Sequence, residues 1–321
     1  MSNAIALFDV VCIASWNADL VSTLDRPPAR GETRMAREFS ISPGGKGSNA
    51  AVAAARQGAR VALIARIGDD DFGRMGLALW QAEGIDTTQV ECATGEASGV
   101  AQIWVYADGD NSIAVCPGAG AGLGAEQVHH ARNLLTSCRV VMASCEVPLA
   151  ATLAAFTLAR AGGAITVLNP APACPLPDAL LTLVDVLTPN ETELLALADC
   201  GPTASPDAAA SQLLQRGVKV VLVTLGASGC RLYRPAMDPV RLPGHSVAVI
   251  DTIGAGDCFT GTLAALLARG EAPVDAMHGA NAAAALSVTR AGAVAGMPTR
   301  AAVQAELADS AAGTHAGGPH C

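Results

Sequence analysis

Short apolar runs alternate with alanine- and leucine-rich stretches along most of the chain, and this alternation constrains the fold more than any other feature. The runs have the length and the β-branched content of strands. Several of the stretches between them end in glycine, a common helix stop. The strand candidates are residues 8–15, 60–68, 139–144, 164–172, 185–190 and 218–226. Apolar strands separated by helices predict an α/β fold of three layers, α/β/α, with a mainly parallel central sheet.

Two segments depart from this pattern and predict a small β-sheet lid. Residues 99–118 alternate apolar and polar side chains around Asp108 and Gly109, which is typical of a hairpin. The polar segment 19–41 contains two consecutive prolines and fits strand and loop outside the main sheet. We therefore expect a lid formed by about 19–41 and 99–116. Its apolar faces would need cover from a substrate or from a second subunit.

The remaining length predicts one α/β domain over residues 1–305. The last segment, 306–321, is rich in glycine, alanine and histidine, and it predicts a disordered tail.

Residues 245–251, "HSVAVID", alternate like a further strand just before a glycine turn.

Composition excludes several classes of protein. Hydrophobic residues make up 51% and charged residues 15% of the chain, which excludes a disordered protein. The net charge of −9 argues against nucleic-acid binding. No uncharged apolar run reaches the length of about 18 residues that a membrane span needs. The ten cysteines contain no C-x-x-C pair, which is typical of reduced thiols in a cytoplasmic protein.

The stretch "DTIGAGDCFTGTLAALLARG", residues 251–270, places a glycine turn and a carboxylate at the start of a helix. Gly254, Ala255 and Gly256 would present unpaired backbone N–H groups to an anion. Asp257 follows them directly, where it could cap the helix or take a proton from a nucleophile. On spacing alone the cap and the catalytic base fit equally well.

Two other glycine-rich segments resemble phosphate loops less closely. In "GGKGSN", residues 44–49, Lys46 is followed by glycine rather than by the serine or threonine of a Walker A loop. "GAGLGA", residues 120–125, matches a dinucleotide-binding pattern but follows a hairpin strand instead of opening a βαβ unit. A dehydrogenase therefore remains only an alternative.

Polar side chains stand at the ends of several predicted strands. Asn17 and Asp19 follow the first strand two residues apart, so they share one side of an extended chain, where they suit either a polyhydroxylated ligand or an ordinary turn. Because ligands of open parallel sheets bind at the carboxyl ends of the strands, these positions predict one crevice. The other strand-end residues are Glu146, Asn169, Asn190 and Glu193.

Together these segments resemble the PfkB, or ribokinase, family of carbohydrate kinases from about residue 8 to residue 305. The resemblance is carried by "GGKGSNAAVAAARQGA" with "IGDDDFG" after it, and by "DTIGAGDCFTGTL". "SWNAD", "NPAPA", "TPNETE" and "TLGASG" follow in the family's order. It implies a ribokinase-like fold and an ATP-dependent transfer of the γ-phosphoryl group to a primary hydroxyl of a sugar. D-ribose is the first candidate, with 2-deoxyribose, a ketohexose or a nucleoside as alternatives. A binding protein that lacks catalysis is a further alternative.

The resemblance also implies roles for individual residues. Asp257 would be the general base, and Gly254, Ala255 and Gly256 would bind the phosphoryl group. Glu193 would hold Mg²⁺ through water. The sugar hydroxyls would be bound by Asn17, Asp19, Gly45, Lys46, Asn49, Glu146 and Asp257. The nucleotide would be bound by Asn190, Thr224, Gly226, Gly229, Gly256 and Asn281.

Family members also hold a monovalent cation, usually K⁺, beside the glycine turn. The matching positions are Asp251, Ile253, Ser287, Arg290, Gly292 and Gly296. Three residues depart from the family's pattern: Trp16 is bulkier than the usual aliphatic residue, Gly120 replaces an asparagine, and Gly296 replaces a frequent serine. The resemblance further implies a homodimer formed through the β lid.

Overall fold

The predicted strands form one sheet of nine strands in the computed structural model, which describes residues 7–108, 110–198 and 204–315. The order across the sheet is β13-β12-β11-β10-β9-β8-β1-β4-β5. The seven strands from β11 to β5 are parallel, and β12 and β13 continue the sheet antiparallel at one edge. The strands are β1 (Val10–Ala14), β4 (Val61–Gly68), β5 (Asp86–Ala93), β8 (Val140–Ser144), β9 (Ile165–Asn169), β10 (Val186–Leu187), β11 (Val220–Thr224), β12 (Cys230–Arg234) and β13 (Met237–Leu242).

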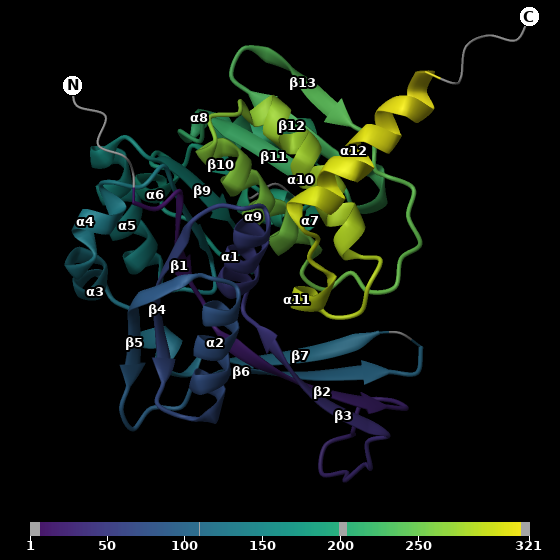
Figure 1. Cartoon of the computed structure of the whole chain (residues 1–321). Helices are drawn as coiled ribbons and strands as arrows, with labels where there is room; N and C mark the ends of the chain where they lie inside the picture. The colour runs from purple at the N-terminus through teal and green to yellow at the C-terminus, as the bar shows by residue number, and fades with distance from the viewer. Residues whose placement is uncertain (1–6, 109, 199–203, 316–321) are drawn as a thin grey trace, which may run out of the picture.

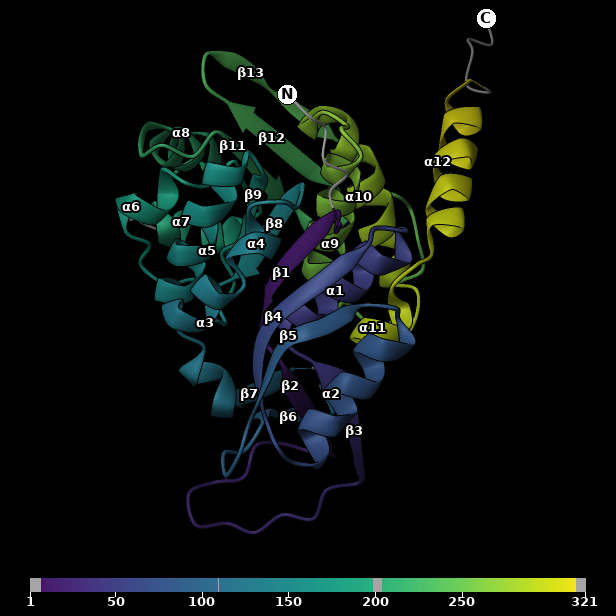
Figure 2. The same cartoon turned by 60° about the vertical axis from the view of Figure 1, so that its left-hand side comes forward.

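Helices cover both faces of this sheet, as Figure 2 shows. On one face lie α1 (Lys46–Arg56), α2 (Asp71–Ala82), α9 (Ala255–Ala268), α10 (Pro273–Ser287), α11 (Ala293–Gly296) and α12 (Arg300–His315). On the other lie α3 (Ala125–His130), α4 (Arg132–Leu135), α5 (Leu149–Gly162), α6 (Asp178–Leu181), α7 (Glu191–Leu197) and α8 (Pro206–Gln215). The three-layer prediction is therefore confirmed.

Two buried cores explain why the strands are apolar along their whole length. Val10 and Cys12 of β1 point into the core beneath α1, α9 and α10. Val11 and Ile13 point into the opposite core, beneath α5 and its neighbours. Because successive side chains face opposite sides of a strand, a sheet covered on both faces needs no polar alternation.

The lid is a separate sheet of four strands in the order β3-β2-β6-β7. Its strands are β2 (Asn17–Leu24), β3 (Glu38–Gly44), β6 (Gly99–Tyr106) and β7 (Asn111–Cys116). In Figure 1 it lies beyond the ends of β1 and β4, away from most of the helices. The hairpin prediction for 99–118 corresponds to antiparallel β6 and β7. Gly109, at its predicted turn, lies outside the described residues.

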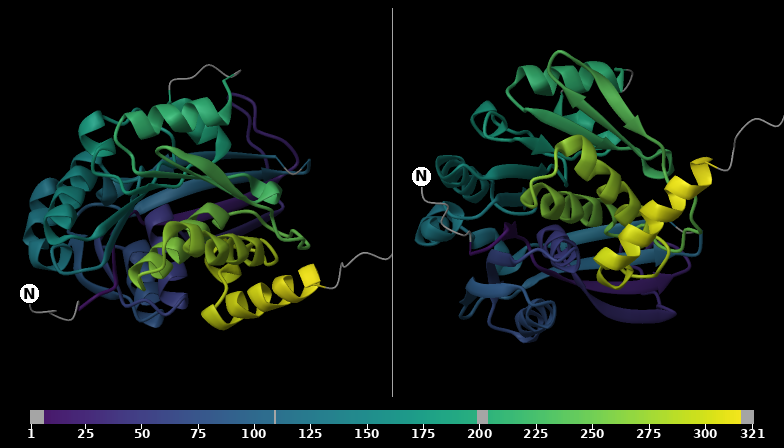
Figure 3. Two further views of the ribbon diagram at one scale, coloured as in Figure 1. Left: turned by 90° about the horizontal axis from the view of Figure 1, so that it is seen from above. Right: turned by 45° about the horizontal axis from the view of Figure 1, so that its top comes forward.

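Two local predictions fail. Residues 245–251 form no strand, and the exposed fractions of Val249 and Ile250 are 62% and 66%. The predicted disordered tail is helical over 306–315, because α12 continues to His315 alongside α10 (Figure 3). Residues 316–321 lie outside the described part of the chain. Over the described residues, the structure contains no helix of the length and apolarity that a bilayer crossing needs.

Candidate active site

The carboxyl ends of the parallel strands meet at one edge of the sheet, and most predicted site residues gather there. A cavity of about 390 Å³ opens at this edge. Strand ends and the start of α9 form its walls together. The lining residues are Lys46, Asn169, Ala171, Thr188, Asn190, Glu191, Thr192, Glu193, Thr224, Gly226, Thr252, Gly254, Ala255, Gly256 and Asp257.

The glycine turn shapes the start of α9 as an open cradle. Gly254 has a φ of 77°, and a Cβ atom there would come within 2.8 Å of the Ala293 Cβ atom. Gly256 is different, because a Cβ atom there would meet nothing within 4 Å. The first N–H groups of a helix have no partner within the helix. Those of α9 therefore suit an anion in the cavity.

Asp257 is buried at the floor of this cradle and is held by two amides. Its exposed fraction is 5%. The Asn49 Nδ2 atom donates to Asp257 Oδ2 at 2.9 Å, and the Asn169 Nδ2 atom donates to Oδ1 at 3.3 Å. Burial raises the pKa of Asp257 to about 6, and the nearby Lys46 ammonium opposes the rise. The carboxylate is thus poised to exchange a proton near neutral pH.

Lys46 is the cation among several acids at this site. The pKa of Lys46 is raised, chiefly by the charge of Asp257. The pKa of Asp19 is raised to about 7, first by burial and then by the charges of Glu146 and Asp257. Carboxylates that outnumber their cation in a cavity are a mark of a functional site.

Glu146 joins three chain segments at the rim of the site. Its Oε2 atom accepts the backbone N–H of Lys46 at 2.8 Å and the Ser15 hydroxyl at 2.7 Å. The Ser15 Oγ atom in turn accepts the backbone N–H of Gly47 at 3.0 Å. Gly45 has a φ of 90°, and a Cβ atom there would lie 2.7 Å from the Ser15 carbonyl oxygen. Ser15, at the end of the first apolar run, belongs to this network although no sequence motif predicted it.

Asn17 and Asp19 enter the site from the lid strand β2. Asn17 pairs in register with Gly44 of β3 and Gly99 of β6. The Asn17 side chain lies against Gly99, and the Asp19 carboxylate lies against Gly44. Because any larger residue at either glycine would collide with these side chains, the glycines leave the room that the polar groups occupy.

Trp16 lies between the central sheet and the lid and turns away from the cavity. Its indole N–H donates to the Phe72 carbonyl at 3.1 Å. The ring meets Trp80 edge-on, with centroids 5.3 Å apart, and rests on Gly76. The bulky residue therefore fills space beneath α2 rather than space in the cavity.

Asn190 and Glu193 form a capping box at the start of α7. Asn190 Oδ1 accepts the backbone N–H of Glu193 at 2.8 Å, and Glu193 Oε2 accepts that of Asn190 at 2.9 Å. Both residues also line the cavity. The "N-x-x-E" spacing thus caps the helix, and the Glu193 carboxylate still lies at the cavity.

Gly229 and Asn281 lie apart from the lining of this cavity but close to a common segment. The Asn281 Nδ2 atom donates to the Pro243 carbonyl oxygen at 2.8 Å. A Cβ atom at Gly229 would lie 2.5 Å from the Pro243 carbonyl carbon. The two residues therefore border the chain that leaves β13 toward the glycine turn.

The residues predicted for a monovalent cation form a second group beside the turn. Asp251 accepts the backbone N–H groups of Ile253 at 2.9 Å and of Gly292 at 2.7 Å. The Ser287 and Arg290 carbonyl oxygens both face Gly296, where a side chain would collide with the Ser287 oxygen. In the described ranges no cluster of three or more histidine, cysteine, aspartate or glutamate side chains forms a metal centre.

Comparisons with known proteins point to one family. The model of the pfkB family of carbohydrate kinases matches residues 7–300. The chain is 38% identical to a ribokinase from Haemophilus influenzae over 90% of this chain and 94% of that protein. It is 35% identical to a deoxyribokinase from Salmonella typhi over 91% and 96%.

Solved structures agree with this result. The structure of Arabidopsis thaliana ribokinase complexed with ribose and ATP matches 94% of this chain and 98% of that chain, with a TM-score of 0.88 and 29% identity. An Escherichia coli protein assigned as a ribokinase II, in complex with ATP and Mg²⁺, matches 94% and 100%, with a TM-score of 0.80 and 25% identity.

Proposed function

Because the chain belongs to the PfkB family of carbohydrate kinases, and is thus a sugar kinase that uses ATP, we propose that its acceptor is D-ribose. The products are D-ribose 5-phosphate and ADP. The alternative acceptors are 2-deoxyribose, favoured by the likeness to a deoxyribokinase, and a ketohexose or nucleoside. Because ATP is the donor, we expect the reaction in the cytoplasm.

The placement of Asp257 carries the proposal for the chemistry. It is buried in the first turn of α9, next to the glycine turn, and it lines the cavity. The sugar hydroxyl gives its proton to Asp257 as its oxygen forms a bond to the γ-phosphorus atom. The bond from that phosphorus to the bridging oxygen breaks, and ADP leaves. The backbone at Gly254, Ala255 and Gly256 stabilises the charge on the transferring group.

The remaining assignments follow the walls of the site. We place the sugar hydroxyls against Asn17, Asp19, Gly45, Lys46, Asn49 and Glu146. We place ATP along Asn190, Thr224, Gly226 and Gly256, with its base toward Gly229 and Asn281. Glu191 and Glu193 offer the hard carboxylate oxygens that Mg²⁺ prefers, on the cavity wall. When bound, Mg²⁺ neutralises phosphate charge, and Glu193 holds its water shell.

We assign Asp251, Ile253, Ser287, Arg290, Gly292 and Gly296 to a K⁺ site. The convergence of the Ser287 and Arg290 carbonyls on Gly296 supports this assignment. Asp251 fixes the loop by accepting N–H groups on either side of it. Equal rates in K⁺ buffer and in Tris buffer without K⁺ would remove K⁺ from the mechanism.

We also assign the lid as the surface of a homodimer. Its edge strands expose Phe39 and Ile41 on β3, and Ile113 and Val115 on β7. Exposed apolar side chains on a thin sheet are typical of a surface that a second chain covers. A monomer in sedimentation experiments at micromolar concentration would contradict this assignment.

The test of the proposed function is an ADP-release assay over pentoses, hexoses and nucleosides, with Asp257→Asn as the matched variant. We expect the largest kcat/KM for D-ribose. The variant should lose about 10²- to 10⁴-fold in kcat, the range of general-base catalysis. Sugar binding, measured by calorimetry, should persist. Near-full activity of the variant would refute the base, and background ADP release with every sugar would refute the substrate class.

A further inference from the structure

Asn169 lies at the reacting centre, and the proposed function gives it no task. It is the last residue of β9, a strand near the middle of the sheet. Its side chain is buried, with an exposed fraction of 6%. The residue lines the cavity together with Asp257. The polar end of a central strand is thus aimed at the proposed base.

Two amides hold the Asp257 carboxylate, one on each oxygen. Asn49 of α1 donates to Oδ2, and Asn169 of β9 donates to Oδ1. The two donors come from different elements, a helix and a strand. A carboxylate bonded on both oxygens cannot rotate about χ2 without breaking a bond. Its free lone pairs therefore keep one direction.

We propose that Asn169 is a positioning residue for the catalytic base, which fixes the Asp257 carboxylate so that a free lone pair meets the sugar hydroxyl. This role rests on the proposed function, because it needs Asp257 to be the base. Asn169 acts through Asp257 rather than on the substrate. Errors of about 1 Å in the position of a reacting group can cost about 10²-fold in rate, so such a clamp has a measurable effect.

The two amide donors should also act on the pKa of Asp257, because an N–H donor favours the ionised form of a carboxylate. Burial raises the pKa of Asp257, whereas N–H donors favour its ionised form. Loss of the Asn169 donor should raise this pKa further. The proposed base works only when it is ionised. In a variant with a higher pKa, activity would therefore be lost at a higher pH than in the wild type when the solution is acidified. The other titratable groups that act on Asp257 or respond to it are Cys12 of β1, Asp19 of β2, Lys46 of α1, Glu146 after β8, Glu193 of α7 and Cys258 of α9.

The test compares pH profiles of kcat/KM for D-ribose in the full-length protein. Asn169→Leu keeps the approximate shape but removes the donor. We expect kcat/KM to fall about tenfold or more at pH 7. The acidic limb of the profile, where kcat/KM falls as the pH decreases, should shift to higher pH by about one unit. Asn169→Asp keeps the shape and adds a like charge, so it should move the limb further in the same direction.

Thr166→Val is the matched control on the same strand. Thr166 is a fully buried polar residue of β9 that bonds Leu183 and Asp185 and does not touch Asp257. It should change the thermal midpoint but leave the acidic limb in place. An unchanged limb in both Asn169 variants, with Asp257→Asn still inactive, would overturn the role of Asn169 alone. An active Asp257→Asn would instead overturn the proposed function.

Discussion

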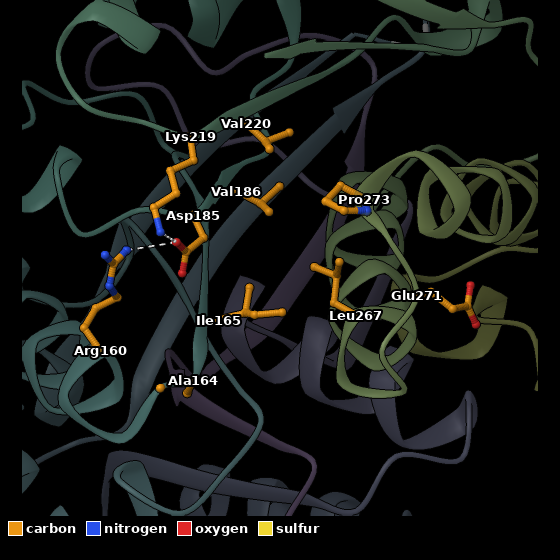
Figure 4. Close-up of a pocket in the computed structure, with 11 residues that line it drawn as sticks. Arg160, Ala164, Ile165, Asp185, Val186, Lys219, Val220, Leu267, Glu271 and Pro273 are labelled. Carbon is orange, nitrogen blue, oxygen red and sulfur yellow. Dashed lines mark hydrogen bonds and ion pairs between the residues drawn. The ribbon is translucent and has the colours of Figure 1, made fainter. Parts of the chain in front are cut away.

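The strands β9, β10 and β11 end in two cavities of similar size that differ in how their charges are paired. At the amino ends a cavity of about 440 Å³ has an apolar floor formed by Ile165, Val186 and Val220 (Figure 4). Its Asp185 carboxylate accepts from Arg160 at 2.9 Å and lies 2.6 Å from the Lys219 ammonium. Figure 4 shows both cations beside this acid, each joined to it by a dashed line.

At the carboxyl ends the balance is reversed. Asp19, Glu146 and Asp257 all interact with the cation Lys46, and the pKa values of Asp19 and Asp257 are raised to about 7 and about 6. Paired charges are a structural arrangement, whereas crowded acids in a cavity cost stability and provide reactivity. One sheet therefore separates the two tasks by placing them at opposite ends of the same strands.

The variant with the largest expected effect is Gly256→Ala, in the cavity at the carboxyl ends of the strands. A Cβ atom there meets nothing within 4 Å, so the variant should fold normally. Alanine is also a better helix former by about 1 kcal/mol. The methyl group would instead occupy the proposed approach of the phosphate, and kcat/KM for ATP should fall about 10²- to 10³-fold.

The control is Gly254→Ala, where the left-handed φ of 77° and the contact with Ala293 both oppose a side chain. That variant should lose stability as well as activity. Thermal melts and ATP kinetics on both proteins separate the two effects. A fully active Gly256→Ala protein would show that no phosphate approaches at this residue.

The contrast also explains how much the sequence could predict. The apolar runs predicted the sheet because burial on both faces leaves a local signature; residues 60–68 correspond to Val61–Gly68 of β4. The clamp on Asp257 left no such signature. Asn49 and Asn169 lie 208 and 88 residues from it in the chain, so only the fold brings them together.

The two failed predictions have physical causes. "HSVAVID" has the period of a strand, but the structure pairs β13 at that edge of the sheet only with β12, and residues 245–251 pair with no strand. The prediction of a disordered tail rested on composition alone. In the structure α12 packs on the protein through buried Val303, and the Oε1 atom of Glu306 lies 2.7 Å from His245 Nδ1. Pairing and docking are tertiary effects that a local pattern does not contain.

A second test measures how the burial of the Asp257 carboxylate makes the stability of the protein depend on pH. The pKa of Asp257 rises from its ordinary 3.8 to about 6 on folding, so the native state binds more protons than the unfolded state between these values. The wild-type free energy of unfolding should therefore fall as pH rises from about 4 to about 6. Asp257→Asn lacks this loss, so between pH 4.5 and 7.5 the difference in unfolding free energy between the two proteins should change by about 2 kcal/mol in favour of the variant. Urea unfolding of both proteins between pH 4.5 and 7.5 measures it; a constant difference would contradict the raised pKa.

The smallest test is Asp185→Asn at the paired end of the strands. The Asp185 carboxylate accepts the Thr166 backbone N–H at 2.9 Å and pairs with Arg160 and Lys219. The neutral amide leaves both cations without their acid, and its NH₂ group faces one donor. We expect a loss of about 2 kcal/mol in the free energy of unfolding.

The kinetic outcome of Asp185→Asn decides whether the two ends of the strands are independent. Asp185 directly precedes β10, at the end of the strand away from the cavity that holds Asp257. With the fold intact, kcat and the KM for both substrates should stay within about twofold of wild type, because distant sites without shared partners add independently. Lys219→Met, which removes only the half-exposed cation, should cost less than about 1 kcal/mol. A loss of kcat in Asp185→Asn that exceeds its loss of folded protein would mean that the paired end transmits strain along β10 to the reactive end.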